Sequence, residues 1–145
     1  MTYQYKRILV GIDGSPQAEI ALKKGIQIAI NDKAELILAH VIDTRATQSV
    51  ATLDGFVFEQ LENEANRILK KYKELAQEKG LENVKSIIEF GNPKTLLATD
   101  IPEKENVDLI MLGATGLSTF ERLLIGSSSE YIMRHAAVDI LIVRK

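Results

Sequence analysis

The chain has 145 residues, of which 46% are hydrophobic and 26% are charged, and its formal net charge is −2. This length and composition are typical of one soluble domain, which we expect to span residues 1–145. The dispersed, slightly acidic charge argues against nucleic-acid binding, and the apolar runs are too short to span a bilayer. The absence of cysteine excludes disulfides and thiolate metal sites, and the N-terminus has no signal-peptide pattern, so we expect a cytoplasmic protein.

The first part of the chain is predicted to alternate strand and helix. Residues 6–12 form a short apolar run rich in β-branched residues, typical of a strand buried on both faces. Ser15 is suited to an N-cap and Pro16 to the first position of a helix. A second strand is expected at 35–42, followed by a polar, irregular segment at 43–55.

The middle of the chain is predicted to begin with a long amphipathic helix. Residues from about 56 to 79 place their apolar side chains on one side only, and Gly80 is suited to end this helix in the left-handed conformation. A strand is expected at 84–90. The turn Gly91-Asn92-Pro93 that follows has the pattern of an N-cap before a helix that opens with proline.

The last part of the chain is predicted to contain two further helices and two strands. One helix is expected at 94–101, and Pro102 should end or kink it, because proline lacks a backbone donor and clashes one turn back. Strands are expected at 108–112 and 139–143, with a helix through Met133 between them.

The alternation of five strands with helices predicts the α/β class. We expect a single-domain, three-layer open sandwich, in which a parallel sheet has helices on both faces. Ligands bind such sheets outside the carboxyl ends of the strands, where the winding direction reverses. The strand orders 3-2-1-4-5 and 2-1-3-4-5 are both compatible with the pattern. In the first of these, the loops at 13–16 and 113–119 flank one crevice.

Glycines and serines gather in and beside the second of these loops. Gly113 and Gly116 permit positive φ and the close approach of a ligand to backbone amides. Gly126-Ser127 stands where the N-terminus of a helix would favour an anion. The stretch 113–129 contains no lysine and only one arginine, Arg122. Neither a P-loop nor a dinucleotide fingerprint is present, so on spacing alone the stretch is either an ordinary glycine turn or a phosphate cradle.

The spacing Gly113-x2-Gly116-x9-Gly126-Ser127 resembles the nucleotide-binding signature of the universal stress protein family, in its ATP-binding branch. The likeness covers essentially the whole chain. Further matching segments are Ile8–Ser15, His40-Val41-Ile42, Gly91-Asn92-Pro93, Val107–Gly113 and Glu121–Val143. The resemblance implies a Rossmann-like, adenine nucleotide alpha hydrolase-like fold with the strand order 3-2-1-4-5.

The same resemblance implies an adenine nucleotide as the ligand, ATP with or without Mg²⁺. Carried over by position, Asp13 and the backbone of Val41 would hold the nucleoside end. The residues implied around the phosphates are Gly113, Gly116, Gly126, Ser127 and Ser128. Thr115 stands where many members carry Arg or His, so a basic partner of the phosphates is missing.

A nucleotide-dependent stress-response regulator is the function that the resemblance implies. We expect no enzyme, because the sequence shows no grouping of histidine, carboxylate and nucleophile. The alternatives are a slow ATP hydrolase, a nucleotidyl-handling enzyme that uses Asp13 as a base or metal ligand, and a dimeric interaction module without nucleotide. His40 is interpreted as a structural residue, and His135 as a complement to the dipole of its helix.

The last strand is expected to mediate self-association. If it is the edge of the sheet, its unpaired backbone groups and apolar side chains need a cover. Pairing with a second copy across a two-fold axis supplies one, and the family resemblance also implies a homodimer. The residues expected in this contact are Ile140, Leu141, Ile142 and Val143. No nucleic-acid or membrane partner is expected.

Overall fold

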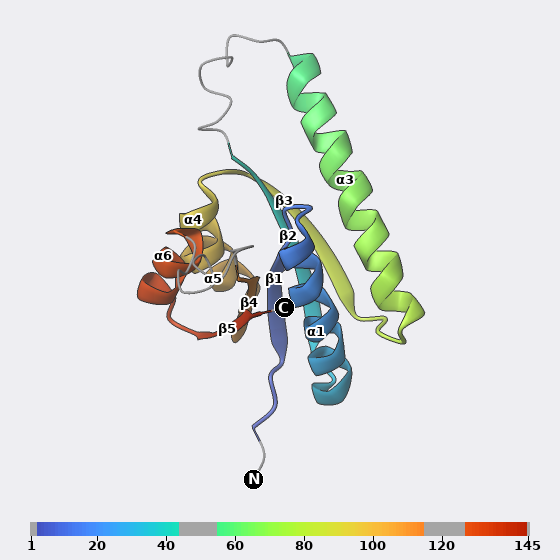
Figure 1. The fold of residues 1–145 in the computed structure, drawn as a ribbon, viewed down its shortest axis with the longest axis vertical. Helices are drawn as coiled ribbons and strands as arrows, with labels where there is room; N and C mark the ends of the chain where they lie inside the picture. Colours follow the sequence, from blue (N-terminus) through green and yellow to red (C-terminus); the bar gives the residue numbers. More distant parts are fainter. Residues whose placement is uncertain (1–2, 44–54, 115–126, 145) are drawn as a thin grey trace.

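The computed structural model describes residues 3–43, 55–114 and 127–144, which form a three-layer α/β sandwich around one parallel sheet (Figure 1). The strands are β1 (Arg7–Gly11), β2 (Glu35–Asp43), β3 (Val84–Gly91), β4 (Leu109–Gly113) and β5 (Asp139–Val143). The helices are α1 (Pro16–Asp32), α3 (Gly55–Glu78), α4 (Pro93–Thr95), the π-helical turn η2 (Leu96–Asp100), α5 (Ile101–Glu105) and α6 (Ser127–His135). The sheet has the order β3-β2-β1-β4-β5. This confirms the predicted class and order, and the winding reverses between β1 and β4.

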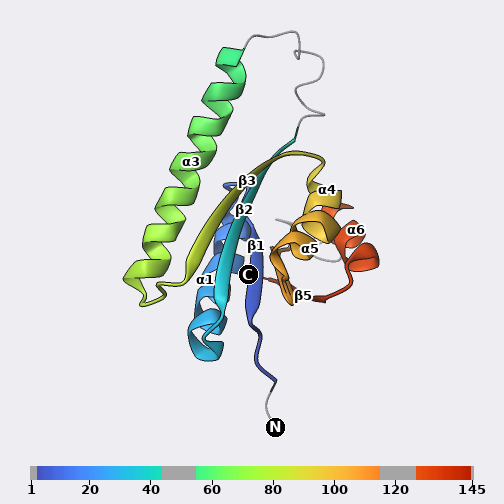
Figure 2. The same ribbon diagram turned by 180° about the vertical axis from the view of Figure 1, so that it is seen from behind.

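Two apolar cores cover the two faces of the sheet. Side chains of β1 alternate between them, as the two-residue period of a strand requires. Ile8 and Val10 belong to the core with α1 and α3, and Leu9 belongs to the core with η2, α5 and α6. Figures 1 and 2 show α1 and α3 on one side of the sheet and α4, α5 and α6 on the other. Burial on both faces explains why this strand is a continuous apolar run in the sequence.

Both predicted N-caps are confirmed. The Ser15 hydroxyl accepts a hydrogen bond from the backbone N–H of Ala18 at 3.1 Å. The Asn92 side chain accepts one from the backbone N–H of Lys94 at 3.0 Å. Each cap is followed by a proline whose missing N–H is unneeded at a helix start. Gly80, just beyond α3, has the expected positive φ, at +100°.

Pro102 does not end its helix, because the chain stays helical from Pro93 to Glu105. The turn before the proline is π-helical, and the N–H of Ile101 bonds to the carbonyl of Leu96. A proline ring clashes with the carbonyl one α-helical turn back, and it has no N–H to bond there. A wider turn accommodates the ring without breaking the helix.

The segment expected to be irregular is shorter at both ends than predicted. β2 extends to Asp43 and α3 begins at Gly55, whereas residues 44–54 lie outside the described part of the chain. Within the described ranges, no helix is long and apolar enough to cross a membrane.

Candidate functional site

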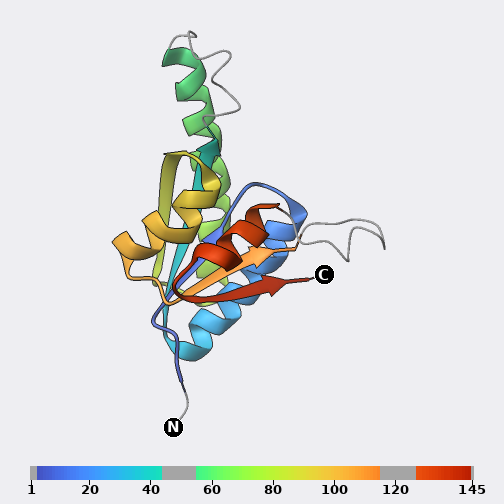
Figure 3. The same ribbon diagram turned by 90° about the vertical axis from the view of Figure 1, so that its left-hand side faces the viewer.

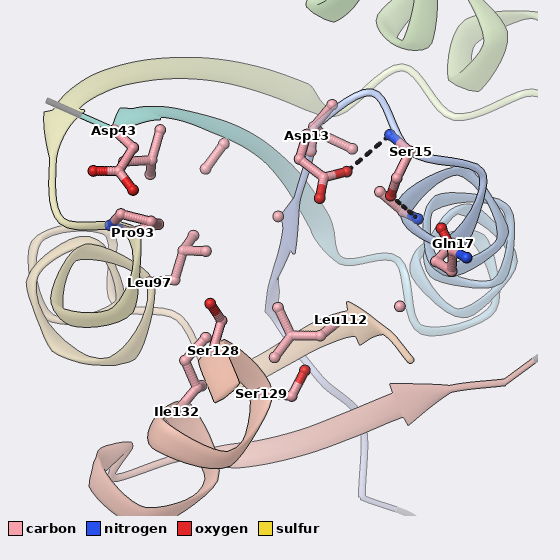
Figure 4. A pocket seen from close by; sticks show the side chains of 16 residues that line it. Asp13, Ser15, Gln17, Asp43, Pro93, Leu97, Leu112, Ser128, Ser129 and Ile132 are labelled. Atoms are coloured by element: carbon pink, nitrogen blue, oxygen red, sulfur yellow. Dashed lines mark hydrogen bonds between the residues drawn. The ribbon is translucent and has the colours of Figure 1, made fainter. Parts of the chain in front are cut away.

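A pocket of about 330 Å³ opens at the carboxyl ends of the central strands (Figure 4). The ends of β1, β2 and β4 form its base, and the first turn of α1, α4 with η2, and α6 surround it. This is the switch point at which open α/β sheets bind ligands. Of the predicted site residues, Asp13, Val41, Gly113 and Ser128 line this one pocket.

Asp13 has a structural role and also faces the pocket. Its Oδ1 accepts a hydrogen bond from the backbone N–H of Ser15 at 2.9 Å, which closes the turn between β1 and α1. Gly14 completes this turn with a φ of +83°, a conformation that glycine adopts at little cost. Asp13 is exposed, and its carboxylate lies at the rim of the pocket (Figure 4). The turn-forming and ligand-facing interpretations of Asp13 are therefore compatible.

Gly113, the last residue of β4, is required for close packing. A Cβ at this position would collide with the backbone carbonyl of Gln17 in the first turn of α1. Gly113 is not among the described glycines with positive φ, so the backbone does not use the freedom to adopt positive φ that a glycine permits at this position. The absent side chain lets α1 approach the end of β4, and this contact closes one side of the pocket.

The start of α6 supplies hydroxyl groups to the pocket. Ser128 is exposed and Ser129 is 5% exposed, and both line the pocket above the fully buried Ile132. Ser127 is the first residue of α6, and its side chain is outside what the structure describes. The predicted contacts Gly116 and Gly126, together with Thr115, also lie outside the described residues.

Several lining residues were missed by the sequence reasoning. They are Gln17, Asp43, Pro93, Leu97, Ser129 and Ile132. For Asp43 a signal existed, because Ala39, Val41 and Asp43 alternate along β2 and therefore share one face. Asp43 was instead assigned to the irregular segment. Pro93 and Leu97 reach the pocket through the tertiary packing of α4 and η2, which the local sequence does not indicate.

The charged side chains that line the pocket are hydrogen-bond acceptors. Asp13 and Asp43 are the carboxylates among its described lining residues, and no Lys, Arg or His stands among them. An ionised carboxylate only accepts hydrogen bonds. A ligand must therefore bring donors to the Asp13–Asp43 side, and an anionic group is better placed toward the α6 serines.

The two histidines are not among the residues that line the pocket, and both have contacts within the fold. Nδ1 of His40 lies 2.7 Å from the carbonyl oxygen of Ile12, which confirms that this ring is satisfied within the fold. His135 is in the last turn of α6, and its ring lies 4.1 Å from that of Tyr131.

Comparison with known proteins places this architecture in a family. The sequence model of the universal stress protein family matches residues 4–144. The chain belongs to this family. A Staphylococcus saprophyticus protein named as a universal stress protein is 40% identical over 140 residues, which are 97% of this chain and 84% of the relative.

Solved structures, among them universal stress proteins, share the fold. UspA from Lactobacillus plantarum has a TM-score of 0.82 at 26% identity, and the match covers 99% of this chain and 100% of that chain. The protein MJ0577 has a TM-score of 0.85 at 33% identity, covering 99% and 98%. A universal stress protein solved in complex with cAMP has a TM-score of 0.72 at 26% identity, covering 97% and 98%.

Proposed function

We propose that this universal stress protein binds an adenine nucleotide, ATP above all, in the pocket at the carboxyl ends of β1, β2 and β4. The observation that carries the proposal is the convergence on one pocket of Asp13, Val41, Gly113 and Ser128. They come from the turn after β1 and from β2, β4 and α6. We further propose that nucleotide occupancy regulates contacts of the protein with its partners in the cytoplasm.

The chemistry of the pocket supports a nucleotide lying across it. The side chains of Val41, Leu97 and Ile132 offer apolar surface for a base. Carboxylates accept hydrogen bonds from amino or hydroxyl groups, while serine hydroxyls and the free N–H groups of a helix start favour phosphate. The pocket volume of about 330 Å³ is within the range of small-molecule sites. The cAMP complex of a related protein also favours an adenine nucleotide.

Regulation rather than catalysis is part of the proposal. The described pocket lining offers neither a histidine nor a lysine as a proton-transfer group. No group of three potential metal ligands exists among the described residues, so we propose that any Mg²⁺ binds through the phosphates. An ATP hydrolase remains the second candidate, and sustained turnover above about 1 s⁻¹ with Mg-ATP would favour it.

We also propose a homodimer formed through β5. This strand pairs only with β4 among the described strands, and Figure 3 shows it at the edge of the sheet. Ile140, Leu141 and Ile142 are only partly buried, whereas Val143 is 7% exposed. The opposite edge strand, β3, carries Lys85 and Glu89 instead. The apolar edge is therefore the one suited to pair with a second copy.

The binding proposal is tested by Asp13→Asn. Asparagine keeps the oxygen that accepts from the Ser15 N–H, so the turn is preserved and only the charge is lost. Loss of a hydrogen bond to a charged group predicts an affinity for ATP lower by about tenfold or more. Isothermal titration calorimetry of both proteins measures this difference.

Glu82→Gln is the matched control. Glu82 is exposed and stands before β3, at the opposite end of the sheet. The same change of charge there should leave the affinity for ATP at the wild-type value. Equal ATP affinities in Asp13→Asn and wild type would contradict the site assignment. If the wild-type protein purifies without nucleotide and ATP leaves its melting temperature unchanged, the alternative function is favoured, a dimeric interaction module that binds no nucleotide.

A further inference from the structure

We propose that His40 is a positioning residue of the nucleotide site, which holds the turn that carries Asp13 in the orientation that binds the ligand. This inference rests on the nucleotide binding proposed above. His40 is not among the residues that line the pocket, so its effect on the ligand passes through Asp13. The inference adds a role in binding to a contact that also stabilises the fold.

The chain leaves the sheet at Ile12, directly after β1. The register of β1 with β2 ends at the pair Gly11 and Ala39. One residue later, the N–H of Ile12 still donates to the carbonyl of Ala39 at 2.8 Å. The carbonyl oxygen of Ile12, in contrast, lies 2.7 Å from Nδ1 of His40. β2 therefore holds both backbone polar groups of Ile12, one through its main chain and the other through its histidine.

The partner atom fixes which ring nitrogen of His40 carries a proton. A carbonyl oxygen only accepts hydrogen bonds, so Nδ1 must be protonated and must donate. His40 lies inside the β2–β3 ladder, where it pairs with Ile88, so a well-ordered strand carries this donor. Ile12 is only 2% exposed. Loss of the donor would therefore leave a poorly hydrated backbone carbonyl without a partner.

This hydrogen bond restrains Asp13 through the peptide unit between them. The carbonyl of Ile12 belongs to the planar peptide that joins Ile12 to Asp13, so holding its oxygen holds the plane from which Asp13 continues. On the other side, Oδ1 of Asp13 accepts from the Ser15 N–H at 2.9 Å (Figure 4). The exposed carboxylate at the rim of the pocket is thus oriented before a ligand arrives, which lowers the entropic cost of binding.

A positioning role and a purely structural role of His40 predict different results. A contact that only stabilises the fold would change the affinity for ATP by the same factor whether or not Asp13 is charged. A contact that acts through Asp13 loses its effect on affinity once the Asp13 charge is removed, because the effects of coupled residues are not additive. A double-mutant cycle between His40 and Asp13 therefore separates the two roles.

The experiment measures the affinity for ATP by calorimetry in this cycle. The proteins are wild type, His40→Leu, Asp13→Asn and the double variant, each shown by melting to be folded at the temperature of the titration. We expect His40→Leu to weaken ATP binding by about fivefold or more when Asp13 is present. In the Asp13→Asn background the same change should weaken it by less than about twofold.

Two further variants are the controls. In His40→Asn the amide N–H stands as many bonds from Cβ as Nδ1 does in histidine, so this variant should restore most of the wild-type affinity for ATP. The ring of His135 contacts that of Tyr131 on α6, and His135→Leu should leave the affinity for ATP unchanged.

Nitrogen NMR of the imidazole rings tests the contact without any substitution at His40, so it stands even if His40→Leu does not fold. In wild type, Nδ1 of His40 should be protonated, and its resonance should shift on saturation with ATP. In Asp13→Asn at saturating ATP, the shift should be smaller.

Several results would overturn the inference. His40→Leu could bind ATP as tightly as wild type, or lose the same factor in both backgrounds of the cycle. His40→Asn could bind ATP as weakly as His40→Leu, or NMR could find the ring protonated at Nε2 alone. These results leave nucleotide binding itself intact, whereas a wild type that does not bind ATP overturns the proposed function and this inference together.

Discussion

Gly113 and Asp13 show that single residues of this site also stabilise the fold around it. Gly113 permits contact between the end of β4 and the Gln17 backbone, and Asp13 closes the turn before α1. A substitution at either position can therefore change ligand binding by moving the backbone. Variants that keep the local hydrogen bonds are the informative ones, which is why asparagine rather than alanine is used at Asp13.

Gly113→Ala is expected to destabilise the protein. The added Cβ meets the carbonyl of Gln17, which belongs to the backbone and cannot rotate away. Overpacking of this kind costs about 1–3 kcal/mol, and urea unfolding monitored by circular dichroism measures it. At Gly55 a Cβ meets nothing within 4 Å among the described atoms, so Gly55→Ala should change the free energy of unfolding little. Equal stability of the two variants would contradict the packing role of Gly113.

Tyr5 connects the N-terminal segment to the end of α1 and to the start of β5. Its backbone N–H donates to Asp32 at 2.9 Å, and its hydroxyl donates to Asp139, at the start of β5, at 2.8 Å. The hydrogen bond to Asp139 raises the pKa of Tyr5 to about 12, and burial and the nearby charges of Asp139, Tyr3 and Asp108 add to the shift. The neutral phenol is thus stabilised in the folded state.

The raised pKa of Tyr5 predicts a loss of stability at alkaline pH. Between the unfolded value of 10.0 and the folded value of about 12, the folded state holds a proton that the unfolded state has released. The stabilisation is present below pH 10.0 and is lost as pH rises through about 12. The free energy of unfolding of wild type relative to Tyr5→Phe should therefore decrease over this window. A constant difference would contradict the contribution of this hydrogen bond.

At the level of elements, the strands and caps could be predicted from the sequence because their causes are local. A continuous apolar run of β-branched residues marks β1, and Ser15 and Asn92 each precede a proline at a helix start. The π-helical turn before Pro102 was not predicted. Proline cannot donate the regular α-helical hydrogen bond. Tertiary packing then decides whether the helix ends, bends or widens into a π-helical turn.

The two edges of the sheet differ in a way that sequence patterns show only in part. On β3, Lys85 pairs with Glu105 at 2.7 Å and Glu89 with Lys104 at 3.9 Å, both partners coming from α5. Charged residues on an edge strand oppose pairing with another strand. β5 has only apolar residues from Ile140 to Val143. The strand order makes β3 and β5 the two edges of the sheet, so this contrast distinguishes one edge from the other.

Leu141→Lys is expected to convert the proposed dimer to a monomer. A lysine at this partly buried position of β5 places like charges near the two-fold axis and removes apolar surface from the contact. Ser86→Lys, on the exposed side of β3, is the control and should remain dimeric. Light scattering after size-exclusion chromatography at micromolar concentration measures both masses. A monomeric wild type, or a dimeric Leu141→Lys, would contradict the β5 contact.

At the scale of the whole molecule, the topology assembles the site. The order β3-β2-β1-β4-β5 brings the turn after β1, the end of β4 and the start of α6 together, so the sequence could predict the place of the site from alternation and glycine positions. Gln17, Leu97 and Ile132 could not be predicted as lining residues. They reach the pocket because helices pack at particular rotations on the sheet, and no local pattern encodes that.

The central claim, an adenine nucleotide in this pocket, is tested most directly by titrating ¹⁵N-labelled protein with ATP and following the backbone amides. The account predicts saturable shifts at Asp13, Val41, Gly113 and Ser128, the residues that the fold brings together. Amides at the opposite end of the sheet, such as that of Glu82, should change little. An absence of shifts at millimolar ATP, or shifts confined to residues outside the pocket, would contradict the account.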